Sequence, residues 1–323
     1  MTFWAERNSD SMEYQNSPRG LIVDLLTPLN SDGSIDGHGL GRLLDSIIPY
    51  VQGIFIASPQ SGEGINLGTQ QKVELFAKTL DVIREKVPVF FWVSGDSEKA
   101  TRDNYSKLNG IVVKRKYRGK IFWVDTPLYY HSNRGLPVYY KEISSIAGRP
   151  IILHNNPEFV RGADRPLKRL NIRTSILKEI SSIGEIAGMV YSGSLGRVHN
   201  YQKACRGRKN FRIYDENEGR FLNYPSMSGV VSLGANLFPG QWQKVTLSSL
   251  HISSEEKGYP NYIKQVWESG LFLRKVMEIY DVEPVSILKR ILCDKGLIDF
   301  PYCTHPSGDI KEPLERLKSI IGH

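Results

Sequence analysis

Short apolar runs recur along the chain from about residue 20 onward, and amphipathic stretches separate them. Between the runs, apolar residues follow helical spacing, as at Leu40, Leu43 and Ile47. A continuous apolar run bounded by turn residues is typical of a strand that is buried on both faces. The pattern predicts eight such strands, at residues 21–26, 53–57, 87–93, 120–124, 150–153, 186–190, 211–214 and 229–233.

The alternation of strand and helix indicates how these strands are arranged. Parallel strands buried on both faces need helical crossovers, and eight of them form a closed barrel. An open, doubly wound sheet is the alternative, but the residues after the first run, 24–28 (DLLTP), carry no glycine fingerprint for a dinucleotide. We therefore predict an α/β protein, a (β/α)8 TIM barrel with a C-terminal helical segment.

The chain divides into three parts. Residues 1–19 are polar and without apolar periodicity, which predicts an N-terminal arm. Residues 20–239 form the predicted barrel. Residues 240–323 carry three helical patterns and are expected to complete the same unit.

Composition excludes several classes of protein. The chain is 40% apolar and 24% charged, no apolar run reaches the roughly 18 residues that span a bilayer, and no signal peptide opens it, so we expect a cytoplasmic protein without a membrane anchor. Three cysteines are too few for a disulfide framework. The seven histidines show no metal-ligand spacing, so we predict neither a metal nor another cofactor.

The chain is basic, with 42 Lys and Arg against 34 Asp and Glu, a net charge of +8. The densest basic run, residues 114–120, is expected to be a solvated loop or a subunit contact. Nucleic-acid binding is disfavoured because no recognition fold accompanies the run.

Motifs follow the predicted strands in a definite order. The chain resembles the family of dihydrodipicolinate synthase and N-acetylneuraminate lyase, the pyruvate-dependent class I aldolases, and the resemblance covers roughly residues 20–300. The family has the barrel fold and places its working residues after the strands. The resemblance is carried by residues 26–28 (LTP), 32–36 (DGSID), 61–63 (SGE), 126–130 (TPLYY), 153–157 (LHNNP), 186–189 (IAGM) and 229–236 (GVVSLGAN).

Members of this family form a Schiff base between pyruvate and a lysine near the end of strand six, because the iminium withdraws electrons from the neighbouring carbon. The matching position here is Val190. An isopropyl group forms no imine, so the resemblance implies that the covalent route is closed. A lysine from elsewhere, such as Lys120 or Lys289, would have to replace it. Lys120 begins strand four at the far end, and Lys289 is expected to be a surface charge.

Other family positions differ as well. His154 stands where the resemblance implies a proton-relaying tyrosine, Phe159 where it implies a carboxylate-binding arginine, and Gln60 in place of a relay hydroxyl. The catalytic candidates are His154 and Tyr129, because both side chains transfer protons. The predicted substrate-binding residues are Gln60, Ser61, Glu63, Arg161, Asp215 and Ser232.

Two functional hypotheses follow. In the first, the barrel has lost imine chemistry and acts in small-molecule binding, regulation or assembly, beside an active paralogue. In the second, it is a lyase or hydratase that acts on a keto or hydroxy acid by acid–base chemistry through His154 and Tyr129. The resemblance also implies a homo-oligomer, a dimer or tetramer.

Overall fold

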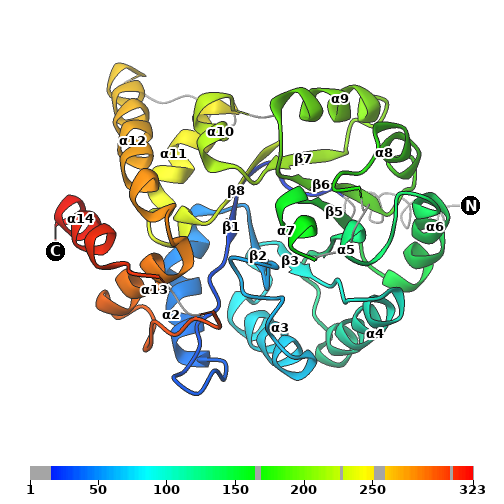
Figure 1. Cartoon of the computed structure of the whole chain (residues 1–323), viewed down its shortest axis with the longest axis horizontal. Coiled ribbons are helices and arrows are strands. Elements are labelled where there is room, and N and C mark those ends of the chain that lie inside the picture. Colours follow the sequence, from blue (N-terminus) through cyan, green and yellow to red (C-terminus); the bar gives the residue numbers. More distant parts are fainter. Residues whose placement is uncertain (1–15, 164–168, 226–227, 251–258, 306–307, 323) are drawn as a thin grey trace, which may run out of the picture.

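The computed structural model describes residues 16–163, 169–225, 228–250, 259–305 and 308–322. Eight parallel strands pair in sequence order and close into a barrel, with β1 beside β8 (Figure 1). The predicted TIM barrel is confirmed, and each predicted strand overlaps an observed one. The strands are β1 Gly20–Asp24, β2 Gly53–Ile56, β3 Val89–Trp92, β4 Ile121–Asp125, β5 Ile151–Asn155, β6 Ile186–Tyr191, β7 Arg212–Asp215 and β8 Gly229–Ser232.

Helices surround the barrel because each crossover between parallel strands returns along the outside. Their apolar stripes pack on the outer faces of the strands; in α2, the buried positions include Leu40, Leu43 and Leu44. The helices up to β8 are α2 Gly37–Ile47, α3 Thr69–Ile83, α4 Glu98–Arg115, α5 Pro127–Tyr130, α6 Leu136–Ala147, α7 Pro157–Gly162, α8 Thr174–Ile180, α9 Leu195–Cys205 and α10 Glu218–Asn223.

After β8 the chain is helical, and α12 and α14 lie together on one side of the barrel (Figure 1). Two short 3-10 turns, Ile48–Tyr50 and Gly234–Asn236, occur elsewhere. No helix among the described residues is long and apolar enough to span a membrane. The remaining helices are α11 Pro239–Ser249, α12 Tyr259–Tyr280, α13 Pro284–Asp294 and α14 Lys311–Ile321.

The barrel closes where β1 meets β8, and a glycine is required there. Gly20 pairs with Gly229, whose φ is +148°. A Cβ atom at Gly229 would collide with the backbone oxygen of Gly20. Only a residue without a side chain lets the two strands approach this closely.

The predicted N-terminal arm lies mostly outside the described residues, but its last part contacts the barrel. Ser17 is buried, and its hydroxyl donates to the carbonyl oxygen of Ala187 at 3.4 Å. The Tyr214 hydroxyl donates to the carbonyl oxygen of Pro18 at 2.5 Å. These residues cover the interior at the amino ends of the strands.

The basic run at 114–120 is not the simple loop that the sequence suggested. Its first residues, Lys114 and Arg115, form the last turn of α4, where positive charge is favourable to the helix dipole. Arg115 also pairs with Asp81 of α3 at 3.1 Å. The run thus contributes to packing between two neighbouring helices.

Candidate functional site

The barrel interior is filled by apolar and aromatic side chains from all eight strands. Trp92 points into it, and Tyr129 stacks on Phe159 with ring centroids 4.9 Å apart. Val190 belongs to the same buried cluster and is only 1% exposed. The position that the resemblance assigns to a lysine amine therefore holds an aliphatic side chain that packs within an apolar cluster.

A chain of hydrogen bonds crosses the interior from β3 to β7. The Trp92 indole nitrogen donates to the Thr126 hydroxyl at 2.9 Å, and that oxygen lies 2.9 Å from Nδ1 of His154. Nε2 of His154 lies 2.9 Å from the Glu216 carboxylate. An ionised carboxylate only accepts, so Nε2 carries a proton, and a neutral His154 accepts the Thr126 proton at Nδ1.

Glu216 receives a second donor. The Asn156 amide donates to its carboxylate at 3.1 Å and to the side-chain oxygen of Gln60 at 3.3 Å. The Glu216 side chain is 15% exposed, whereas that of His154 is fully buried. Glu216 is therefore the more exposed member of the pair, and His154 lies behind it.

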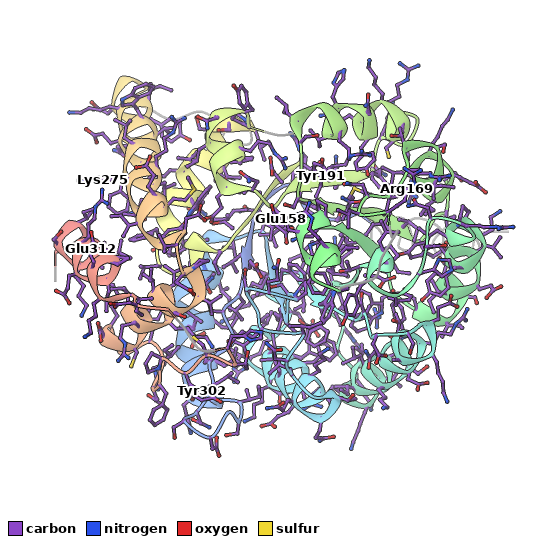
Figure 2. The ribbon with its side chains drawn as sticks, viewed as in Figure 1. Glu158, Arg169, Tyr191, Lys275, Tyr302 and Glu312 are labelled. Carbon is purple, nitrogen blue, oxygen red and sulfur yellow. The ribbon has the colours of Figure 1, made fainter. Side chains whose placement is uncertain are left out.

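A cavity of about 280 Å³ opens at the carboxyl ends of the strands, where barrels of this type place their sites. Its polar lining comes from the end of β1, from the segments that follow β2, β5, β6 and β7, and from the end of α12. Figure 2 shows Glu158 on α7 near the centre of the molecule, with Lys275 and Glu312 far away on the C-terminal helices. The polar residues of the lining include Asp24, Ser58, Gln60, Ser61, Asn156, Glu158, Ser192, Glu216, Asn217, Glu218 and Asp281.

Asp24 is the most unusual of these groups. It is 4% exposed, and its Oδ1 atom has no hydrogen-bond partner among the described residues. Burial raises the pKa of Asp24 to about 7; the Ser58 hydroxyl lowers it, and the negative charge of Glu216 raises it again. An aspartate with this pKa exchanges its proton near neutral pH.

Glu218 also lines the cavity, but its hydrogen-bonding capacity is largely used. It accepts from the Ser232 hydroxyl at 2.5 Å, the Gly234 amide at 2.8 Å and the Tyr280 hydroxyl at 2.6 Å. Burial raises the pKa of Glu218, and these three donors counteract it. Ser232, a predicted binding residue, thus holds Glu218 in place and does not itself line the cavity.

The predicted site residues are not all brought together. Gln60 and Ser61 line the cavity, and His154 reaches it through Glu216. Tyr129 and Val190 lie in the interior cluster. Glu63, Arg161, Asp215 and Ser232 do not line the cavity.

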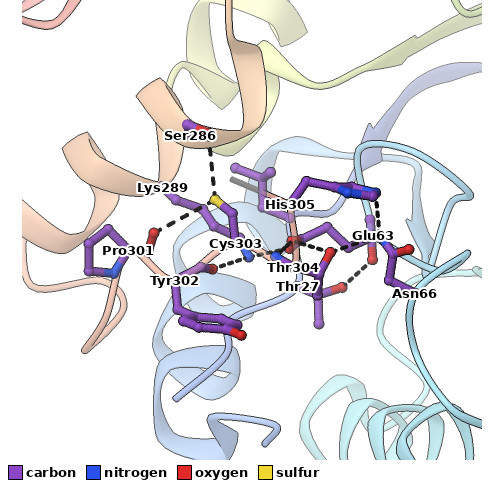
Figure 3. A network of polar contacts seen from close by, with 12 residues as sticks. Thr27, Glu63, Asn66, Ser286, Lys289, Pro301, Tyr302, Cys303, Thr304 and His305 are labelled. Atoms are coloured by element: carbon purple, nitrogen blue, oxygen red, sulfur yellow. Dashed lines mark hydrogen bonds and ion pairs between the residues drawn. The ribbon is translucent and has the colours of Figure 1, made fainter. Parts of the chain in front are cut away.

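Glu63 and Lys289 form a buried ion pair, shown in Figure 3. Lys289 also donates to the carbonyl oxygen of Tyr302 at 2.7 Å, and Glu63 accepts from the Thr304 amide at 2.6 Å. The prediction that Lys289 is a surface charge is wrong, because its side chain is fully buried. Its amine is held by Glu63 and does not line the cavity.

Asp215 and Arg161 point away from the cavity. Side chains alternate along a strand, so Tyr214 points into the barrel and Asp215 points outward. Asp215 pairs with Arg220 at 2.5 Å. Arg161 is an exposed residue of α7 and does not line the cavity.

One lysine does approach the interior cluster. Nζ of Lys72, in the first turns of α3, lies 4.5 Å from the centroid of the Trp92 ring. Burial lowers the pKa of Lys72 to about 8. Lys120 precedes β4, at the opposite end of the barrel from the cavity.

The sequence interpretation missed Asp24 and Glu216. A signal for Asp24 was present, because it is the one charged residue inside the first apolar run. Glu216 follows directly after Asp215 and carried no separate signal. Among the described residues, no group of three or more His, Cys, Asp or Glu side chains could hold a metal ion.

Relatives of this chain span almost its whole length. A 4-hydroxy-tetrahydrodipicolinate synthase from Shewanella piezotolerans is 22% identical over 310 residues, 93% of each chain. A protein of the same name from Shewanella sp. strain W3-18-1 is 27% identical over 240 residues, 73% of this chain and 76% of the relative.

Solved structures share the fold. A monomeric dihydrodipicolinate synthase variant aligns with a TM-score of 0.77 at 21% identity, covering 95% of this chain and 96% of the other. An N-acetylneuraminate lyase from Fusobacterium nucleatum aligns with a TM-score of 0.75 at 18% identity, covering 94% and 97%. The model of the dihydrodipicolinate synthetase family matches residues 17–320. This chain is therefore a member of the dihydrodipicolinate synthetase family.

Proposed function

We propose that this barrel binds a small molecule in its mouth cavity and does not activate pyruvate as an imine through residue 190. The observation that carries the proposal is Val190, 1% exposed within an apolar cluster. The neighbouring stack of Tyr129 on Phe159 supports it, because an aromatic ring at residue 159 offers no charge to a substrate carboxylate. Relatives are named as synthases, so this proposal implies that the chain shares their fold without sharing their activity.

Trapping with borohydride tests the proposal directly. The full chain is incubated with pyruvate and sodium borohydride, and its intact mass is measured; the synthase from Shewanella piezotolerans serves as the positive control. We expect no adduct on this chain, because a reduced pyruvyl group needs an amine at the carbonyl carbon.

Lys72 supplies the matched control. Lys72→Arg keeps the positive charge over Trp92 but removes a nucleophilic amine. A single stable adduct on the unmodified chain would refute the proposal. Its disappearance in Lys72→Arg would identify the replacement amine.

A second candidate is acid–base catalysis without an imine, favoured by the hydrogen-bond chain that ends at Glu216. In this case Glu216 exchanges the proton with the substrate, and His154 orients it from behind. Such proton transfer contributes about 10²–10⁴-fold in rate. His154→Gln should then lower any lyase or hydratase turnover on keto or hydroxy acids by at least tenfold, whereas unchanged turnover would eliminate this candidate.

Regulation, assembly with an active paralogue, and a homodimer or homotetramer also stay proposals. Their basis is the family resemblance. Light scattering of the purified chain, alone and mixed with an active synthase from the same cell, measures both kinds of association.

A further inference from the structure

The described lining of the mouth cavity is negatively charged. It includes the carboxyl groups of Asp24, Glu158, Glu216, Glu218 and Asp281, and the described lining holds no Lys, Arg or His side chain. An anionic ligand such as a keto acid would be repelled by these negative charges. The charge balance of the site therefore favours a ligand of the opposite sign.

These carboxyl groups are not equivalent. Glu218 already accepts three hydrogen bonds, and Glu158 and Asp281 are exposed at the rim, where water screens them. Asp24 and Glu216 remain at the inner end of the cavity. Glu216 has protein donors in His154 and Asn156.

Asp24 is the observation that points to a ligand. Its carboxyl group is buried in the cavity wall, and Oδ1 has no donor within the described chain. Buried polar atoms almost always have a partner, and an isolated buried carboxylate is costly. A positively charged donor would both donate a hydrogen bond to Oδ1 and neutralise the buried charge, whereas a neutral hydroxyl would only donate a hydrogen bond.

We infer that the mouth cavity binds a small organic cation, with its ammonium or guanidinium group held by the carboxyl groups of Asp24 and Glu216. A bare metal ion does not fit, because the described residues offer no cluster of three ligating side chains. The cavity of about 280 Å³ suits a molecule the size of a small metabolite. This inference rests on the proposed small-molecule role and names the ligand class for it.

Ligand binding should depend on pH through Asp24. A cation binds the ionised carboxyl group, and Asp24 has a pKa of about 7, so binding releases a proton from the fraction that is protonated. The apparent affinity should fall about tenfold from pH 8 to pH 6. The other titratable groups that face Asp24 are Glu216 and His154, and Glu158, Glu218 and Asp281 share the cavity.

Isothermal titration calorimetry of the full chain tests the inference. The probes are agmatine, which carries both cationic groups, putrescine, which carries ammonium groups alone, and pyruvate as the anion. Asp24→Asn removes the inner charge at constant shape, and Asp103→Asn removes one exposed carboxylate on α4, outside the cavity lining, as the matched control. Thermal unfolding confirms that both variants are folded.

We expect at least one of the two amines to bind the unmodified chain more tightly than pyruvate does. Asp24→Asn should weaken that binding tenfold or more and abolish its dependence on pH, whereas Asp103→Asn should change it less than about threefold. The inference is overturned if neither amine binds, if Asp24→Asn binds the amine unchanged, or if pyruvate binds as tightly. Pyruvate that binds reversibly and as tightly as the amines, without a borohydride adduct, would overturn this inference alone, and an adduct would overturn the proposed function.

Discussion

Replacing Asp24 with asparagine should stabilise the fold above neutral pH. In the unfolded chain this carboxyl group has a pKa near 3.8, and in the fold burial raises the pKa to about 7. Between these values the folded chain holds a proton that the unfolded chain has lost. The free energy of unfolding therefore falls as pH rises from about 4 to about 7.

The magnitude follows from the difference between the two pKa values. At 1.36 kcal/mol per unit, a difference of about 3 units corresponds to roughly 4 kcal/mol lost by pH 8. Of this loss, roughly 2.5 kcal/mol occurs between pH 5 and pH 8, because Asp24 in the folded chain is mostly protonated at pH 5 and mostly ionised at pH 8. Asparagine fills the same space without a charge, so the variant should escape this loss.

Urea unfolding at pH 5 and at pH 8 measures the effect in both chains. The unmodified chain should be more stable at the lower pH by an amount that Asp24→Asn does not show. Asp281→Asn, which removes an exposed carboxylate, should follow the unmodified chain. An Asp24→Asn variant that is less stable than the unmodified chain at pH 8 would refute the reasoning, because the carboxylate would then be stabilising.

The remaining predictions concern the buried pair of Lys289 and Glu63. Lys289→Met should lower the free energy of unfolding by about 3–5 kcal/mol, because it leaves a buried carboxylate without its cation. Adding Glu63→Gln to Lys289→Met should recover part of that loss, since the second change removes the unpaired charge. Urea unfolding of both variants checks these outcomes, and additive losses in the double variant would contradict the pairing.

The fold was predictable because parallel barrel strands have a simple sequence pattern. Each strand is buried on both faces, so the runs around Ile22, Phe90 and Ile152 are continuously apolar rather than alternating. Eight such runs separated by helical patterns leave little choice of architecture. Three of the C-terminal helices, α12, α13 and α14, also followed from their periodicity, whereas α11 was not predicted.

The site was only partly predictable. Gln60 and Ser61 were found because they lie in the loop after a strand, at positions that match a motif of the family. The Glu63–Lys289 pair joins residues 226 positions apart, and no local pattern indicates such a contact. Asp215 and Glu216 are adjacent acids that the strand directs to opposite sides, so the choice between them required knowing the strand register.

The pair of Lys289 and Glu63 can form only late in the synthesis of the chain, because Lys289 follows all eight strands in the sequence. Glu63 belongs to the loop after β2 that carries Gln60 and Ser61, and its cationic partner is supplied by α13. On the ribosome, all eight strands emerge before this lysine does. Until translation is nearly finished, Glu63 therefore lacks its cationic partner near the mouth of the barrel. The mouth cavity should become able to bind a ligand only when α13 has packed against the barrel.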